Sequence, residues 1–126
     1  MRTDDYLEYD FGRRWKPGEF DCTLFVADWV KAKCGRDPAE FFRGTYSTLK
    51  EGIEAVESRG GVLRFCDQRM QMVGWRRTES TPRDGDVGVV MAPLEPKGEM
   101  GPIPAIYAGS MWVARGRHGQ RAGQFK

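Results

Sequence analysis

The chain contains few of the residues from which most enzyme sites are built. Its 126 residues include one histidine and three cysteines, and its formal net charge is only +2. A charge this small gives no reason to expect a nucleic-acid partner. The cysteines are odd in number and lack the spacing of zinc ligands. The sequence therefore predicts free thiols, a reducing compartment and no metal site.

Long apolar runs are missing as well. Because no stretch of 18 apolar residues occurs, we expect no membrane span. The first five residues are polar and acidic, which is untypical of a secretory signal peptide, so we expect synthesis in the cytoplasm without one. The glycine pair Gly60-Gly61 lacks the lysine and hydroxyl residue of a phosphate-binding loop, and no cofactor is predicted.

The residue pattern changes character halfway along the chain, which predicts an α+β domain with helices before strands. Apolar spacing and turn residues predict helices over 21–35, 37–42, 47–58 and about 62–72, then strands over 86–91, 105–108 and 111–114. We expect an antiparallel meander, with the Pro- and Gly-rich stretch 93–104 as a loop. The expected organisation is a leading segment over 1–18, a domain over 15–115 and a flexible basic tail over 116–126.

The most informative segment places a cysteine where a loop gives way to a helix. Asp21 is a suitable N-cap, Cys22 follows in the first turn, and Gly35 ends the helix. A helix N-terminus carries partial positive charge and free N–H groups, which favour a thiolate. Cys22 is therefore a candidate nucleophile of the papain kind. The alternative is a buried structural cysteine, since free cysteine packs as a small hydrophobe.

Three segments together resemble the NlpC/P60 superfamily of cell-wall peptidases: Asp21-Cys22, the strand 84–90 with its Gly-Asp pair, and 103–109. The resemblance implies a papain-like fold, in which N-terminal helices pack on a small antiparallel sheet and Cys22 takes the nucleophile position. The family's catalytic histidine falls on Ile103, or on Pro104 if the register shifts by one. The third polar position of that family falls near Ala114 or Arg115.

A narrower resemblance covers Asp21-Cys22, Ala27-Asp28, 35–39 and 42–48, which are similar to small phage and prophage tail-cluster relatives that lack the histidine. It implies a structural or assembly component of a phage-type tail tip or baseplate, derived from a peptidase and catalytically degenerate. The implied partners are a tail hub or other tail-tip proteins, with peptidoglycan as a further possibility, and the implied location is the virion. We expect the contacts to come from the loop 93–104 and the tail arginines Arg115, Arg117 and Arg121.

Two other functions remain open at this stage. In an active cysteine peptidase or amidase that cuts peptidoglycan as a particle penetrates the cell, Cys22 would be the nucleophile. The N–H groups at its helix start would form an oxyanion hole, and the only histidine, His118, would be the base. Otherwise His118 is an exposed loop residue. The third function is a free cytoplasmic binding domain.

Three secondary expectations concern residues near the candidate nucleophile. Residues 43–46 either line the cleft or only connect two helices. Asp28 is expected to face away from Cys22 on the same helix. Cys34 and Cys66 carry no motif and are expected to be packing residues.

Overall fold

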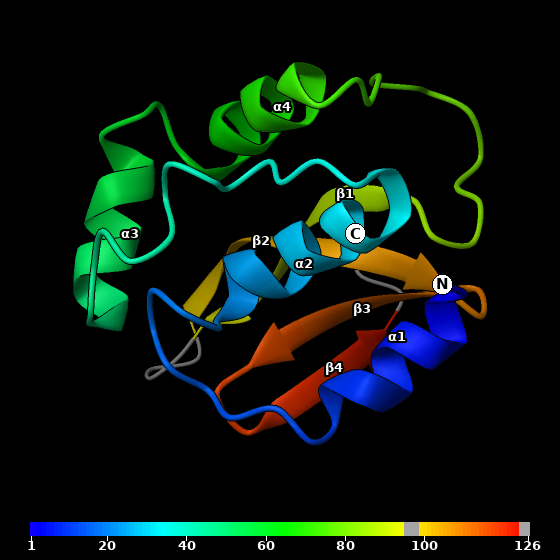
Figure 1. Ribbon diagram of the computed structural model, residues 1–126, viewed down its shortest axis with the longest axis horizontal. Helices are drawn as coiled ribbons and strands as arrows, with labels where there is room; N and C mark the ends of the chain where they lie inside the picture. The colour runs from blue at the N-terminus through cyan, green and yellow to red at the C-terminus, as the bar shows by residue number, and fades with distance from the viewer. Residues whose placement is uncertain (95–98, 124–126) are drawn as a thin grey trace.

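The computed structural model describes residues 1–94 and 99–123, and it shows an α+β arrangement of helices packed on an antiparallel sheet (Figure 1). The helices are α1 (Thr3–Asp10), α2 (Cys22–Cys34), α3 (Leu49–Glu57) and α4 (Val62–Met72). The strands are β1 (Val87–Leu94), β2 (Glu99–Ala108), β3 (Met111–Gly116) and β4 (Gly119–Gly123), in the order β1-β2-β3-β4. The α+β class and the antiparallel meander are confirmed.

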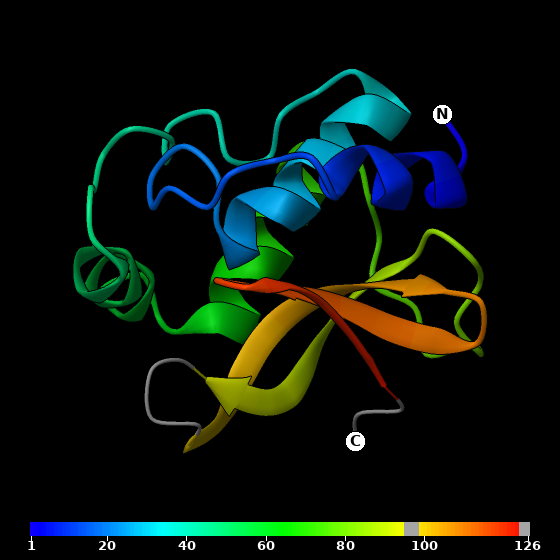
Figure 2. The same cartoon turned by 90° about the horizontal axis from the view of Figure 1, so that it is seen from below.

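Helix α2 forms the centre of the structure because it is apolar around most of its circumference. Phe25, Trp29 and Val30 on this helix are all fully buried. They pack against Ile106 and Val113 of the sheet, so one helix joins the helical layer to the strands. Figure 2 shows α1 and α2 on the same side of the sheet.

Local residues set both ends of α2 as the sequence predicted. Asp21 accepts hydrogen bonds from the N–H groups of Thr23 and Leu24, each at 3.0 Å, and thereby caps the helix start. Gly35 ends it in the left-handed region at φ 77°, a conformation that glycine adopts without strain. The prediction that Cys22 lies in the first turn of a long buried helix is confirmed.

The leading segment 1–18 packs on the domain, and part of it is helix α1. Tyr6 on this helix is 2% exposed and donates its hydroxyl hydrogen to the carbonyl of Phe25 at 2.5 Å. Its ring also lies against Phe25 and Trp29. The segment therefore belongs to the same core as α2.

Helices α3 and α4 form at the predicted places. A reciprocal capping box starts α3, in which Thr48 caps the backbone of Glu51 and the Glu51 carboxylate accepts from the Thr48 N–H. Helix α4 has the predicted bounds, Val62–Met72. The predicted helix over 37–42 is wrong, because residues 38–44 form turns. There Asp37 accepts from the Ala39 N–H at 2.9 Å and fixes a local turn instead of starting a helix.

The prediction of a loop over 93–104 is wrong for the described part of that range. Strand β1 continues to Leu94 and β2 begins at Glu99, while residues 95–98 lie outside the described residues. Proline is normally excluded from a strand that pairs on both sides. Here β3 pairs with β2 only over Ile106–Ala108, so Pro102 and Pro104 lie in a stretch of β2 that pairs with β1 alone.

The prediction of a flexible tail over 116–126 is wrong up to residue 123. Strand β3 extends through Arg115 to Gly116, and a two-residue turn leads into β4. Strand β4 has few apolar side chains, but Gln120 donates to the Leu7 carbonyl at 2.8 Å and so holds the strand against α1. Residues 124–126 lie outside the described residues. The domain boundary at residue 115 therefore cuts through the sheet.

Among the described residues, no helix has the length and apolar character needed to cross a membrane.

Candidate functional site

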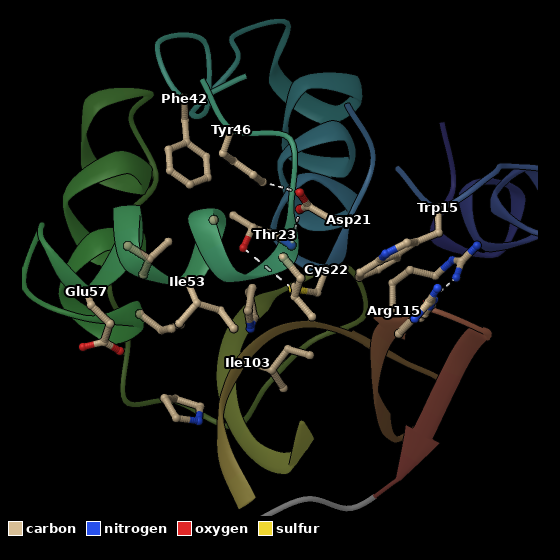
Figure 3. A pocket seen from close by; sticks show the side chains of 18 of the residues that line it. Trp15, Asp21, Cys22, Thr23, Phe42, Tyr46, Ile53, Glu57, Ile103 and Arg115 are labelled. Atoms are coloured by element: carbon tan, nitrogen blue, oxygen red, sulfur yellow. Dashed lines mark hydrogen bonds between the residues drawn. The ribbon is translucent and has the colours of Figure 1, made fainter. Parts of the chain in front are cut away.

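Cys22 is the first residue of α2 and lines a pocket between the helices and the sheet. Figure 3 shows it between Tyr46 and Ile103, with Glu57 and Arg115 on opposite sides. The pocket has a volume of about 130 Å³. Most of its wall is apolar, from Phe42, Leu49, Ile53, Val56, Pro93 and Ile103.

Ile103, the residue on which the resemblance places the family's catalytic histidine, lines the same pocket as Cys22. Ile103 is 4% exposed and belongs to an apolar cluster that Cys22 packs against. Within the described chain, the only hydrogen-bonding neighbour of the Cys22 sulfur is the Thr23 hydroxyl, 4.0 Å away. A neutral hydroxyl can share a hydrogen bond with the thiol, but it is too weak a base to remove the thiol proton.

His118, the other candidate catalytic residue, lies in the turn between β3 and β4. Its side chain is exposed, and it is not among the residues that line the pocket. The structure therefore does not bring His118 and Cys22 together. Of the two, it places Cys22 in the pocket.

Burial has a larger effect on the Cys22 thiol than its helix position. It raises the pKa of this thiol to about 12, and the nearby charge of Asp21 adds to the increase. The helix start also has less free hydrogen-bonding capacity than expected, because Asp21 already accepts from the N–H groups of Thr23 and Leu24. The expectation that the helix start favours a thiolate is wrong for this site, and these two N–H groups are not available to an oxyanion.

Asp21 has a second role beyond capping, since it ties three segments together. Its other carboxylate oxygen accepts from the Gly18 N–H at 3.1 Å and from the Tyr46 hydroxyl. Burial, followed by the charge of Asp21, raises the pKa of Tyr46 well above its usual value. Tyr46 is therefore a neutral hydrogen-bond donor that holds its segment against the start of α2.

For residues 43–46 the sequence left two roles open, lining the cleft or connecting two helices, and the structure shows both. Tyr46 lines the pocket, whereas Arg43 points into an ion network with Asp28 and Asp37 at 2.6 and 2.7 Å. Asp28 also accepts from Arg13 at 2.5 Å. Asp28 thus faces away from the pocket, as expected, and helps to join α2 to its neighbouring segments.

Arg115 is one of the two residues near which the resemblance places the family's third polar position, and it lines the pocket while its guanidinium makes hydrogen bonds to other segments. It donates to Asp10 at 3.0 Å and to the carbonyls of Arg13 and Gly116. Arg115 is 5% exposed and Asp10 is fully buried, so this ion pair lies inside the protein. Arg115 therefore anchors α1 to the sheet at one side of the pocket.

The other two cysteines differ from each other. Cys66 packs against the cluster around Phe65, and burial raises its pKa to about 11. Cys34 is exposed, so the expectation that it is a packing residue is wrong. All three cysteines are free thiols. Within the described ranges, no group of His, Cys, Asp or Glu side chains could hold a metal ion.

Sequence reasoning missed the wall of the pocket that comes from α3. Leu49, Ile53 and Val56 on this helix all line the pocket, and Val56 also belongs to a buried core cluster. Ile53 is 48% exposed as a result. Arg117 and Arg121, which the sequence assigned to a flexible tail, line the same pocket.

Gly52 gives a testable link between α3 and Tyr46. A Cβ atom at this position would lie 2.7 Å from the Tyr46 ring, whose hydroxyl is held by Asp21. Gly52→Ala is therefore expected to destabilise the protein by about 1–3 kcal/mol, although alanine normally favours a helix. Urea unfolding measures this. In a Tyr46→Ala background the same change should become stabilising, and a stabilising effect in the wild-type background would contradict the packing described.

Comparison with known families places the chain in one of them. A family model described as "Domain of unknown function (DUF6950)" matches residues 1–125, and the chain belongs to this family. No curated protein and no solved structure matches the chain.

Proposed function

We propose that the chain is a catalytically inactive relative of the NlpC/P60 cell-wall peptidases, retained as a structural or assembly component of a phage-type tail tip. One observation supports the proposal of inactivity: Ile103, on which the resemblance places the family's catalytic histidine, is a buried apolar residue beside Cys22 and cannot take a proton. The tail-tip assignment rests on the sequence resemblance described above. The proposed partner is a tail hub or another tail-tip protein.

The geometry of the pocket supports loss of catalysis in two further ways. A thiol with a pKa near 12 is almost entirely protonated at neutral pH. In addition, the negative charge of Asp21 acts on the Cys22 sulfur, and it would oppose the further negative charge that develops during acyl transfer. A pocket of this kind can still bind a partner.

An active peptidase or amidase is the second candidate, because Cys22 does line a pocket. The two functions differ in turnover on a peptidoglycan stem peptide, measured by mass spectrometry of the products. We expect none above the level of a Cys22→Ala control. Turnover that depends on Cys22 would overturn the proposal of inactivity.

The assembly role is tested on particles. If the genome that encodes the chain produces phage-type tails, mass spectrometry of the purified tails should find this chain in a fixed ratio to the hub protein. A Cys22→Ala chain should be incorporated equally well. Purified, intact tails that lack the chain would overturn the tail-tip assignment.

Alkylation tests the state of the thiol directly. With a pKa of about 12 for Cys22, roughly one thiol in ten thousand is ionised at pH 8. Iodoacetamide should therefore modify exposed Cys34 long before Cys22 in the folded protein. The Cys22 rate should keep rising up to about pH 12. Peptide mapping gives both rates, and faster modification of Cys22 than of Cys34 at pH 8 would contradict this prediction.

A further inference from the structure

The size and lining of the Cys22 pocket restrict what it can hold. Its volume is about 130 Å³, and an apolar cavity of roughly 150 Å³ accommodates a benzene molecule. The pocket therefore has room for one apolar side chain and not for an extended polar peptide. Ile103 and Val56, which line the pocket, are both buried, so an apolar group that binds there is removed from contact with water.

The pocket is open to solvent along α3. Ile53, which lines it, is 48% exposed, and Pro102 on the opposite wall is exposed as well. Both side chains are apolar. An apolar group that entered from this side would cover them and gain contact area with the wall.

Charged residues from two parts of the chain line the pocket. Arg117 and Arg121 come from the turn before β4 and from β4 itself. Glu57 is the last residue of α3. Arg121 donates to the carbonyl of Pro93, another lining residue, at 2.9 Å, and this bond holds its guanidinium beside the pocket without neutralising its charge. An anion attached to the bound group would therefore be favoured on the β4 side.

We propose that the pocket binds one apolar side chain of a partner polypeptide that carries a carboxylate directly beside it, with the carboxylate against Arg121. The inference rests on the proposed function, because it names the contact through which an inactive domain would hold its partner. The carboxylate is the α-carboxylate of a C-terminal apolar residue, because the side chain in the pocket and the carboxylate beside it then belong to one residue. Capture of a C-terminal carboxylate recurs in proteins.

Three synthetic peptides test whether the pocket recognises a C-terminal carboxylate. The first is a hexapeptide of alternating glycine and serine that ends in leucine with a free carboxylate. The second is the same peptide amidated, and the third is amidated but has aspartate directly after the leucine. Titration into ¹⁵N-labelled protein, followed by NMR, should give dissociation constants on the order of 1 mM for a carboxylate-bearing peptide. The amidated peptide without aspartate should bind at least about tenfold more weakly.

Two substitutions and their matched controls test the site. Arg121→Gln removes the charge but keeps a donor, and it should weaken the acidic peptides about tenfold without affecting the amide. Arg76→Gln, at an exposed arginine outside this pocket, should change nothing. Ile53→Glu should abolish binding, whereas Leu63→Glu, at another exposed apolar residue on a helix, should not.

Several results would overturn the inference. One is the absence of a saturable shift of the Cys22 and Ile53 amide resonances up to about 20 mM peptide. Another is binding that Arg121→Gln leaves unchanged. A third is a set of shifts confined to other parts of the protein. Preference for the third peptide over the first would likewise overturn the assignment to a C-terminal carboxylate. Because these measurements use the isolated protein, they are separate from the tests of the proposed function. Turnover of a stem peptide, or absence of the chain from purified tails, would overturn the proposed function. Neither result would change the measured affinity of the pocket for the peptides.

Discussion

Removing residues 115–126 is expected to leave a chain that does not fold. The deletion takes away the whole of β4 and the last residues of β3, including Arg115. It also removes both side chains that donate to the Asp10 carboxylate, Arg115 at 3.0 Å and Gln120 at 2.9 Å. Asp10 is fully buried, so its charge would have no partner there. Losses of this kind exceed the 5–15 kcal/mol or so by which a domain is typically stable.

Circular dichroism and urea unfolding measure the effect of the truncation. The control carries His118→Ser and Arg121→Ser in the full chain, which removes exposed polar side chains while keeping β4. This control should remain folded. A truncated protein with a cooperative unfolding transition would show that the strand is dispensable and that residues 115–126 act as a tail after all.

Breaking the buried ion pair alone should have the second largest effect. Arg115→Met keeps much of the side-chain volume but removes the charge and the hydrogen bonds to Asp10, Arg13 and Gly116. Removing one partner of a buried pair costs about 3–5 kcal/mol, because the other charge stays buried. Urea unfolding should show this loss, and the unfolding midpoint should fall accordingly.

A double variant distinguishes this cause from a general packing defect. Arg115→Met with Asp10→Leu removes both charges and should recover most of the lost stability. If the double variant were less stable than Arg115→Met alone, the uncompensated Asp10 charge would not be the source of the loss. A cost below about 1 kcal/mol for Arg115→Met would mean that the pair behaves like an exposed one.

The elements that the sequence predicted well are those whose ends are set locally. Helix α2 has a capping aspartate at one end and a glycine in the left-handed region at the other, and both act within a few residues. Helix α4 begins directly after Gly61, and its apolar residues recur with helical spacing. In such cases the physical cause lies inside the window that sequence reasoning inspects.

The strands that were missed depend on residues far away in the sequence. Strand β4 is held by Gln120, whose partners lie on α1 more than a hundred positions earlier. In the sequence, Pro102 and Pro104 indicate a loop. They are compatible with strand β2 only because β3 pairs with a different, short part of that strand. No local pattern contains that information, because it depends on which strands are neighbours and over what length.

The candidate site shows the same division. The helix start and its cysteine were predicted from neighbouring residues, but the state of the thiol was not. Burial among Ile103 and its cluster raises the Cys22 pKa, and this burial arises only when β2 folds beneath α2. The pocket likewise exists only because α3 stands beside the sheet, so Ile53 and Val56 could be recognised as apolar but not as lining residues.

The two prolines of β2 also bear on how the protein avoids self-association. Over Pro102 and Pro104, the flank of β2 that β3 leaves unpaired has no N–H group to offer at either position. Pro104 is buried but Pro102 is exposed, so a strand from another molecule would find no donor at Pro102 and could not extend the sheet there. Replacing Pro102 with threonine would restore that donor. An apolar strand that is now a poor template for fibril growth would then become a better one.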